Sequence, residues 1–304
     1  MVKITVPASS ANLGAGFDAL GIALSLYNTV WIDEGDGTPD NPTCDISSCD
    51  DVVIPTDETN LIYQTAKIVY DRVGAPFKGL KLIQKNDIPM TRGLGSSSAC
   101  LVAGLIGANT LLGSPLGKSE ICDLAAKLEG HPDNTAPALL GGLVTAVMGE
   151  NRVHTVSVPV SEKFKFAVFI PSFELKTEVA RKLLPDTISR QDAVYNLSRA
   201  ALMTASLFSG NLENLRVAVG DRIHQPYRLP LIDCSDQIFY IAYNLGAYAV
   251  CISGAGPSIL AIIDKNDAEF ESAANRALKD QNLHDWHIKV LECDAVGATV
   301  KFEK

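Results

Sequence analysis

The chain has 304 residues, of which 47% are hydrophobic and 20% charged, so it can form a core without disulfides or a structural metal and is not mainly disordered. At about 100–200 residues per domain, this length predicts two domains or one large domain. Acidic residues outnumber basic ones by 35 to 26, for a net charge of -9, which argues against a nucleic-acid-coating surface but still allows local Arg and Lys to bind a small anion.

The hydrophobic pattern predicts helices and strands mixed along the whole chain. In the first half we expect strands at residues 3–6, 24–32, 80–84, 143–148 and 153–158, and helices at 60–73, 100–112 and 121–128. In the second half we expect strands at residues 166–170, 249–252, 259–263, 287–291 and 298–302, and helices at 178–184, 190–208, 211–219 and 267–279. This mixture predicts two α/β or α+β units, divided as residues 1–158 and 159–304.

The N-terminus and the cysteines indicate a cytoplasmic protein. Residues 1–14 are polar and interrupted by a proline, where a signal peptide would need a long apolar segment. The most apolar window, residues 99–112, is too short to span a bilayer. Cys44 and Cys49 lie in a Gly-, Pro- and Asp-rich segment, residues 36–51, but their spacing matches no zinc site. We interpret that segment as an exposed loop and expect neither a membrane nor a nucleic-acid partner.

The most informative stretch is PMTRGLGSSSA at residues 89–99. Gly93 and Gly95 allow a tight bend that points backbone amides at one spot, and the serines add hydroxyl donors. The helix predicted to follow, ended by Gly113 as a cap, would carry unpaired N–H groups and partial positive charge at its start. We interpret the stretch as a phosphate-binding loop, although it is neither a Walker A loop nor a dinucleotide fingerprint. The alternative is a Gly/Ser turn that caps a buried helix.

Two further small-residue segments favour the phosphate-binding interpretation. SANLGAGFD at residues 10–18 ends in an acid, and SGAGPS at residues 253–258 separates two predicted buried strands. The three segments, in this order and spacing, resemble the GHMP small-molecule kinases over nearly the whole chain. The resemblance is closest to the homoserine kinases, on PASSANLG at residues 7–14 with GFD after it, and on EGHPDN at residues 129–134 running into APALLGG.

The resemblance implies an α+β fold of two domains, with the active site in the cleft between them. The N-terminal α/β domain would contain a left-handed βαβ unit, an exception to the usual handedness, and the C-terminal domain would be ferredoxin-like. The implied reaction moves the γ-phosphoryl group of ATP, with Mg²⁺, to the side-chain hydroxyl of L-homoserine, a step toward threonine. Homoserine kinases are often dimers, so the resemblance also suggests a homodimer.

The family pattern implies which residues bind the nucleotide and the metal. The phosphate loop would consist of Pro89, Met90, Thr91, Arg92, Gly93, Leu94, Gly95, Ser96, Ser97, Ser98 and Ala99. Asn60 matches a position near the adenine base, and it fits equally well as the N-cap of the helix that follows. Ser97 would ligate magnesium. The second ligand of the family is a Glu eight residues before the histidine of the GHPDN run, which here is Asp123; Glu129 is the nearest substitute.

The family pattern also implies a pocket for the amino acid. Its members here would be Asn12, Asp18, His131, Asn134, Arg181, Arg228, Gly254 and Gly256. Asp18 with Asn12 would bind the ammonium group, and the two arginines would bind the carboxylate, for which a guanidinium is the natural bidentate partner. The remaining histidines, His154, His224, His284 and His287, are interpreted as structural.

No general base is expected. Asp18 is needed by the ammonium group, and an acid already paired with a cation is a poor base. Asp133 neighbours Asn134, and adjacent side chains usually point apart. We therefore expect Asn134, the catalytic residue, to orient the hydroxyl while the γ-phosphate accepts its proton.

Other functions remain open. A GHMP kinase that acts on another small alcohol, such as mevalonate, would not need an acid facing an ammonium group. A non-catalytic sensor of ATP and an amino acid would be favoured by a broken phosphate loop or by loss of Ser97, and the sequence contains neither change. A pure interaction domain would leave the three glycine-rich segments unexplained.

Overall fold

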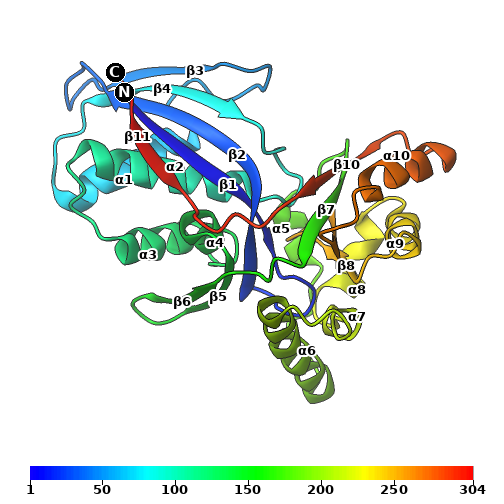
Figure 1. Cartoon of the computed structure of the whole chain (residues 1–304). Helices are drawn as coiled ribbons and strands as arrows, with labels where there is room; N and C mark the ends of the chain where they lie inside the picture. Colours follow the sequence, from blue (N-terminus) through cyan, green and yellow to red (C-terminus); the bar gives the residue numbers. More distant parts are fainter. Residues whose placement is uncertain (304) are drawn as a thin grey trace.

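The first part of the chain forms a mixed sheet with helices on one face in the computed structural model, which describes residues 1–303 (Figure 1). Its strands are β1 (Val2–Ala11), β2 (Leu20–Glu34), β3 (Thr43–Ser48), β4 (Gly79–Asn86), β5 (Leu143–Met148) and β6 (Val153–Val158), joined by β11 (Thr299–Phe302) from the end of the chain. The order is β11-β1-β2-β4-β3, and the β5–β6 hairpin pairs with the far end of β2. The helices are α1 (Leu61–Val73), α2 (Ser96–Leu111), α3 (Lys118–Glu129) and α4 (Thr135–Leu140).

A bulge in the first strand directs the chain toward the second lobe. The register between β1 and β2 shifts between Pro7 and Ala8. Proline cannot donate a ladder hydrogen bond and is tolerated at bulges, and a bulge bends the strand that carries it. Beyond the bulge, β1 continues to Ala11 beside the start of β2, and Leu24 bridges to Cys293 in the last part of the chain.

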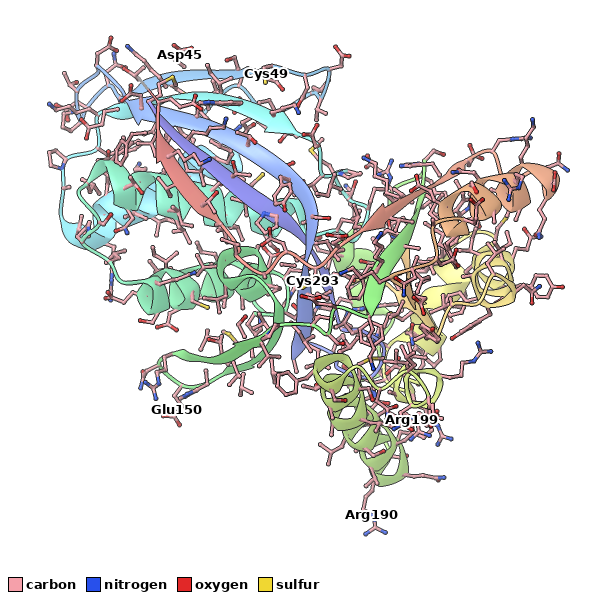
Figure 2. The ribbon with its side chains drawn as sticks, viewed as in Figure 1. Asp45, Cys49, Glu150, Arg190, Arg199 and Cys293 are labelled. Atoms are coloured by element: carbon pink, nitrogen blue, oxygen red, sulfur yellow. The ribbon has the colours of Figure 1, made fainter. Side chains whose placement is uncertain are left out.

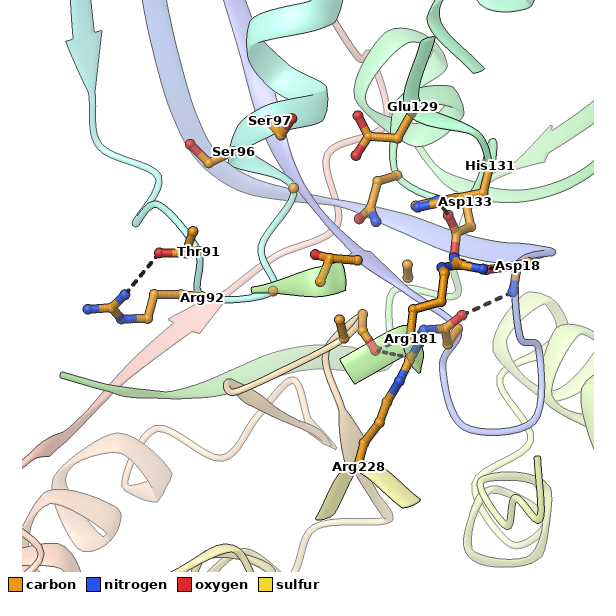
Figure 3. A pocket seen from close by; sticks show the side chains of 18 residues that line it. Asp18, Thr91, Arg92, Ser96, Ser97, Glu129, His131, Asp133, Arg181 and Arg228 are labelled. Atoms are coloured by element: carbon orange, nitrogen blue, oxygen red, sulfur yellow. Dashed lines mark hydrogen bonds and ion pairs between the residues drawn. The ribbon is translucent and has the colours of Figure 1, made fainter. Parts of the chain in front are cut away.

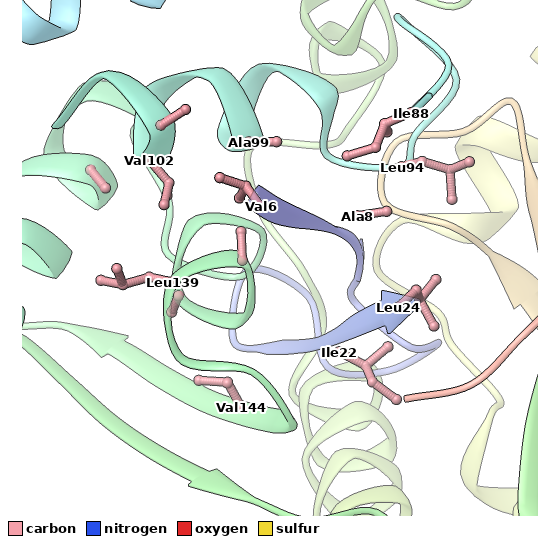
Figure 4. Close-up of a cluster of buried hydrophobic side chains, with 14 of the residues drawn as sticks. Val6, Ala8, Ile22, Leu24, Ile88, Leu94, Ala99, Val102, Leu139 and Val144 are labelled. Atoms are coloured by element: carbon pink, nitrogen blue, oxygen red, sulfur yellow. The ribbon is translucent and has the colours of Figure 1, made fainter. Parts of the chain in front are cut away.

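Helix α2 is buried on almost all sides because it packs against α1 and against the sheet. Figure 4 shows its residues Ala99 and Val102 near Val6 of β1. A Cβ atom on Gly104 would stand 2.0 Å from Thr65 Oγ1 and 2.6 Å from the Ile62 carbonyl oxygen of α1. On the other side, a Cβ atom on Gly107 would stand 3.1 Å from Ile32 of the sheet. These glycines therefore let α2 pack closely on both layers.

The second lobe contains an antiparallel sheet in the order β10-β7-β9-β8. Its strands are β7 (Phe164–Pro171), β8 (Ala249–Ile252), β9 (Ile259–Asp264) and β10 (Trp286–Leu291), with α9 (Ser235–Asn244) and α10 (Phe270–Asp280) packed beside them. A βαββαβ path with this strand order is the ferredoxin-like arrangement, as expected. Between β7 and α9 lie α5 (Thr177–Lys182), α6 (Arg190–Ser209), α7 (Leu215–Ala218), α8 (Gln225–Arg228) and the 3₁₀ turn η1 (Leu229–Leu231). Helix α6 projects from the body, with Arg190 at its tip (Figure 2).

Several sequence expectations require correction. The loop expected at residues 36–51 contains β3, an edge strand parallel to β4, which the periodicity missed because only Ile46 in it is buried. The helix expected at residues 211–219 is reduced to the single turn α7. Helix α9 was not predicted, because its β-branched and aromatic residues are poor helix formers and its apolar face is stabilised by packing against the sheet.

The end of the chain returns to the first sheet, where β11 pairs with β1. The predicted division at residue 158 therefore separates the two sheets only up to β10, because β11 belongs to the first sheet. The exact boundary stays a prediction. The β3-α1-β4 segment is the parallel βαβ unit, and its expected left-handedness also stays a prediction. Within residues 1–303, no helix combines the length and the apolar character needed to cross a membrane.

The packing of α2 leads to a stability prediction for Gly104→Ala. In a helix interior, alanine is favoured over glycine by about 1 kcal/mol, but here its Cβ atom would overlap the Ile62 carbonyl, and overpacking costs about 1–3 kcal/mol. We expect urea unfolding to show a net loss of up to about 2 kcal/mol. Gly117→Ala is the control, because its nearest atom lies 3.6 Å away. A Gly104→Ala protein more stable than the parent would contradict the packing described.

Candidate active site

The three small-residue segments predicted to act together meet between the two lobes. The Ser253 hydroxyl donates to the Gly93 carbonyl oxygen at 2.6 Å and lies 2.8 Å from the Ser10 hydroxyl. The backbone N–H of Gly254 donates to the Ala11 carbonyl oxygen at 3.2 Å. The segments at residues 10–18 and 253–258 and the loop before α2 therefore form a single junction.

The junction requires glycine at particular positions. Gly93 and Gly95 have φ angles of +71° and +69°, which side chains of L-residues disfavour. A Cβ atom on Gly93 would stand 2.3 Å from the Ser253 carbonyl oxygen, and one on Gly95 would stand 2.1 Å from Ser9 Oγ. Gly93 thus allows the backbones of the two lobes to touch, and Gly95 allows the loop to approach the Ser9 side chain of β1. Both are roles beyond making room for a phosphate.

A cavity of about 120 Å³ opens beside this junction (Figure 3). At roughly 10–15 Å³ for each water, it has space for roughly ten waters, enough for a small amino acid. Of the residues expected to bind the substrate, Asn12, Asp18, His131, Asn134, Arg181, Arg228 and Gly254 line it. Gly256 does not line it, because this glycine packs against Ile232.

The loop before α2 contributes only part of its length to the cavity. Thr91, Arg92, Gly93, Gly95, Ser96 and Ser97 line it, whereas Pro89, Met90, Leu94, Ser98 and Ala99 do not. Helix α2 begins at Ser96, four residues earlier than expected, and its first internal hydrogen bond runs from the Ala99 N–H to the Gly95 carbonyl oxygen at 2.8 Å. The amides of Ser96 to Ser98 are therefore left without intrahelical acceptors, as at the anion-binding N-terminus of a helix.

Glu129, at the end of α3, lies across from this helix N-terminus (Figure 3). Its Oε1 accepts a hydrogen bond from the Ser98 hydroxyl at 3.0 Å. Burial, together with the charge of Asp133, raises the pKa of Glu129 against the opposing effects of His131 and Ser98. A partly buried acid beside a phosphate-type site is the arrangement expected of a cation ligand.

Asp123 was expected to be the second magnesium ligand, but the structure places it away from the cavity. Its carboxylate accepts a hydrogen bond from the Val153 N–H at 2.6 Å and does not line the cavity. Asp123 precedes Glu129 by six residues on α3, which separates them by about 9 Å along the helix. Counting back from the histidine therefore leads to an acid outside the cavity, whereas Glu129 of the EGHPDN motif lines it.

Asp18 and Arg181 bind each other in this structure. The guanidinium donates two hydrogen bonds to the carboxylate, at 2.9 and 2.8 Å, from α5 to the turn between β1 and β2. This pairing raises the pKa of Arg181. Asn12 donates to the Gly254 carbonyl oxygen at 2.8 Å and accepts from the Asp18 N–H at 3.0 Å. Through these two bonds Asn12 holds the Asp18 turn in place. Its oxygen keeps a second lone pair and it lines the cavity, so the ammonium contact expected of it stays a prediction.

Arg228 is a buried cation without a carboxylate partner in residues 1–303. It is 1% exposed, and its Nη1 donates to the Gly254 carbonyl oxygen at 3.2 Å. No hydrogen-bond partner in the described chain reaches its Nε. Burial, and then the charge of Arg181, lowers the pKa of Arg228 to about 10. Because burying an unpaired charge is costly, such a residue at a cavity favours an anionic ligand.

Two acidic side chains and a histidine lie close together at the cavity. Ligand atoms of Asp18, His131 and Asp133 lie within 4.8 Å of one another, and His131 Nδ1 contacts the buried Asp133 carboxylate. Burial opposes protonation of His131, but the hydrogen bond and charge of Asp133 outweigh it and raise the pKa of His131. Asn134 lies next to this group, and its Oδ1 accepts a hydrogen bond from the Ser9 hydroxyl at 3.0 Å.

Asn60 acts as the N-cap of α1, one of its two expected roles. Its Oδ1 accepts from the backbone N–H groups of Ile62 and Tyr63, and its Nδ2 donates to the Pro55 carbonyl oxygen at 2.9 Å. It does not line the cavity. The structure therefore does not support the expected adenine contact of Asn60.

Sequence comparison identifies relatives over the whole chain. The family models for the GHMP kinases N terminal domain and the GHMP kinases C terminal match residues 60–142 and 202–280. The chain is 48% identical over 301 residues to the homoserine kinase of Caldicellulosiruptor saccharolyticus, covering 99% of this chain and 96% of that protein. It is 46% identical over 302 residues to the homoserine kinase of Clostridium beijerinckii, covering 99% and 98%.

Solved structures show the same fold. The homoserine kinase from Cytophaga hutchinsonii superposes with a TM-score of 0.87 at 27% identity, covering 99% of this chain and 97% of that one. L. major mevalonate kinase in complex with R-mevalonate has a TM-score of 0.69 at 16% identity, covering 97% and 96%. The second likeness concerns the fold alone.

The junction leads to a prediction on Gly93 and Gly254, whose φ angles are both positive, at +71° and +58°. Alanine at either position would adopt a left-handed backbone conformation, which costs about 1–2 kcal/mol of stability. A Cβ atom on Gly254 would have its nearest atom at 3.5 Å, whereas one on Gly93 would stand 2.3 Å from a backbone oxygen. We expect Gly93→Ala to lower the free energy of unfolding by about 2 kcal/mol more than Gly254→Ala. Equal losses in urea unfolding would show that the close contact is unimportant.

Proposed function

The chain belongs to the GHMP kinase family and, within it, to the homoserine kinases, and we propose that it transfers the γ-phosphoryl group of ATP to the side-chain hydroxyl of L-homoserine. The observation that carries this proposal is the pairing of opposite charges in one small cavity. Arg228 and Arg181 offer cations for a carboxylate, and Asp18 and Asp133 offer anions for an ammonium group. The N-terminus of α2 opens on the same cavity and suits a phosphate.

The nucleotide phosphates are proposed to bind the amides at the start of α2. The bend at Gly95 and the hydroxyls of Ser96 and Ser97 support this assignment. Arg92 has a different role, because its Nε donates to the Pro171 carbonyl oxygen at 2.9 Å and its Nη1 to Met90 at 3.0 Å. It therefore anchors the loop to β7 and is not free to bind a phosphate with its whole guanidinium.

Magnesium is proposed to be held by Ser97 and Glu129, which replace the pair Ser97 and Asp123. A hydroxyl and a carboxylate are the hard oxygen donors that magnesium prefers, and both residues line the cavity beside the α2 N-terminus. Bound there, the ion would neutralise charge on the transferring phosphoryl group. The Ser98 hydroxyl orients the carboxylate of Glu129 through its hydrogen bond.

Homoserine is proposed to bind by exchanging partners with the Asp18–Arg181 ion pair. Its ammonium group takes the place of Arg181 beside Asp18, and its carboxylate binds Arg181 and Arg228. A zwitterion leaves no charge unpaired in this exchange, whereas a hydroxy acid without an amine would leave Asp18 without a cation. Selection for an amino acid follows from that difference.

Asn134 is proposed to orient the reacting hydroxyl. Because its Oδ1 accepts from Ser9, its Nδ2 is the end of the amide that can donate to the substrate hydroxyl oxygen. That oxygen forms a bond to the γ-phosphorus, the bond from phosphorus to the β–γ bridging oxygen breaks, and the hydroxyl proton passes to a γ-phosphate oxygen. A loose transition state needs little activation of the nucleophile, so no general base is required. The cytoplasmic location and the homodimer stay predictions.

The substrate class is tested by ADP release with L-homoserine, L-serine, L-threonine and mevalonate. We expect kcat/KM to be highest for L-homoserine. Mevalonate should be at least about tenfold poorer, because losing one charged hydrogen bond costs about 1.5–3 kcal/mol. Higher activity with mevalonate would contradict the substrate assignment, and binding of ATP and homoserine without any ADP release would identify a sensor.

The metal assignment is tested by comparing Glu129→Gln with Asp123→Asn, two variants that each remove one acid from α3. We expect Glu129→Gln to raise the Mg²⁺ concentration needed for half-maximal activity and to lower kcat by about 100-fold, since charge neutralisation by the metal contributes several kcal/mol. Asp123→Asn should change both values by less than about twofold. The opposite ranking would restore Asp123 as the ligand.

A further inference from the structure

His224 was interpreted from the sequence as structural, but it contacts the cation that faces the cavity. It is fully buried, and its Nε2 lies 2.8 Å from the Gly14 carbonyl oxygen. Its Nδ1 lies 3.4 Å from Arg228 Nη1. A carbonyl oxygen can only accept and a guanidinium can only donate. The neighbours therefore define one neutral tautomer, with the proton on Nε2 and a lone pair on Nδ1 that accepts from Arg228.

The surroundings keep His224 neutral. Burial, and after it the charge of Arg228, lowers the pKa of His224 against the opposing effects of Asp221, the Gly14 carbonyl and Asp18. Asp221 Oδ2 lies 3.6 Å from Nε2, but its carboxylate is also bound by the backbone N–H groups of His224 and Gln225, at 3.0 and 2.6 Å. A neutral imidazole can accept from a guanidinium, whereas an imidazolium could only repel it.

The same segment determines where the guanidinium lies. Asp221 accepts hydrogen bonds from the backbone N–H groups at the start of α8 and so holds this helical turn in place. His224 and Arg228 are four residues apart on that turn, so their side chains face the same side. The Phe17 ring stacks on the His224 ring, with centroids 5.4 Å apart and an angle of 26°. Its centroid also lies 5.3 Å from the Arg228 guanidinium carbon. Arg228 is therefore held by the imidazole, the Phe17 ring and the Gly254 carbonyl.

We propose that His224 is a positioning residue for carboxylate binding: its Nδ1 lone pair holds Nη1 of Arg228, so that the rest of the guanidinium is presented to the cavity. This inference rests on the proposed function, since the anion in question is the carboxylate of homoserine. The reacting hydroxyl lies at the other end of that substrate. Loss of the Nδ1 acceptor should therefore weaken substrate binding and leave the chemical step unchanged, so that KM rises while kcat does not.

The proposal is tested with a matched pair of amide variants. In His224→Asn, the side-chain oxygen can occupy the place of Nδ1 and still accept from Arg228, but the contact with Gly14 is lost. In His224→Gln, the longer side chain can reach the Gly14 carbonyl, but no acceptor remains at the Nδ1 position. Both variants are polar and smaller than an aromatic ring, and thermal unfolding of each shows how much stability the ring contributes.

We expect His224→Gln to raise KM for L-homoserine about tenfold, the equivalent of one hydrogen bond to a charged group, with kcat and KM for ATP unchanged. His224→Asn should stay within about threefold of the parent in all three values. A rise in KM of equal size in both variants would overturn the proposal and show a purely structural role. A parent enzyme that releases no ADP with L-homoserine would instead overturn the proposed function.

The pH profile of KM supplies a second readout that a structural role would not change. In the parent enzyme, KM for L-homoserine should rise as the pH falls through the lowered pKa of His224, because protonation removes the Nδ1 acceptor and adds a cation beside Arg228. His131, whose pKa is raised, titrates at higher pH and remains in both variants. The low-pH rise should vanish in His224→Asn, and its persistence there would contradict the proposal.

Discussion

The contact between Ser253 and the backbone of Gly93 is the constraint on which the rest of the active site depends. It joins a loop of the second lobe to the loop before α2, and the adjacent Ser10 extends the junction to β1. The backbones approach so closely that a single Cβ atom at Gly93 would overlap two carbonyl oxygens. Because the junction fixes the lobes relative to each other, the helix N-terminus and the buried arginine open on the same cavity.

Cationic and acidic side chains line the same small cavity but form separate groups. Arg228 is buried without a carboxylate partner in the described chain, while Asp18, His131 and Asp133 cluster within a few ångströms. The Asp18–Arg181 pair connects these two groups and lowers the cost of holding both signs in a partly dry site. Under the proposed function, a substrate that carries both charges replaces that pair without leaving either partner unsatisfied.

Local patterns predicted much of the fold, and they failed where tertiary packing outweighs local preference. Strands such as β7 and β9 contain continuous apolar runs and were predicted within a few residues. Edge strand β3, with one buried residue, and helix α9, rich in poor helix formers, were missed. The ferredoxin-like strand order came from the family resemblance, since periodicity carries no information on which strands are neighbours.

The sequence by itself determined the family and most of the residues around the cavity, because these depend on residue types in a fixed order. Phosphate binding by the loop at residues 89–99 was predicted in the same way and stays a prediction. Tertiary structure alone decided which acid of α3 reaches the cavity. Asp123 and Glu129 lie on one helix, but only Glu129 is carried to the cavity by the direction of α3. It also brought Asn12 against Gly254 and His224 against Gly14, because hydrogen-bond partners distant in sequence are brought within reach only by the packing of the two lobes.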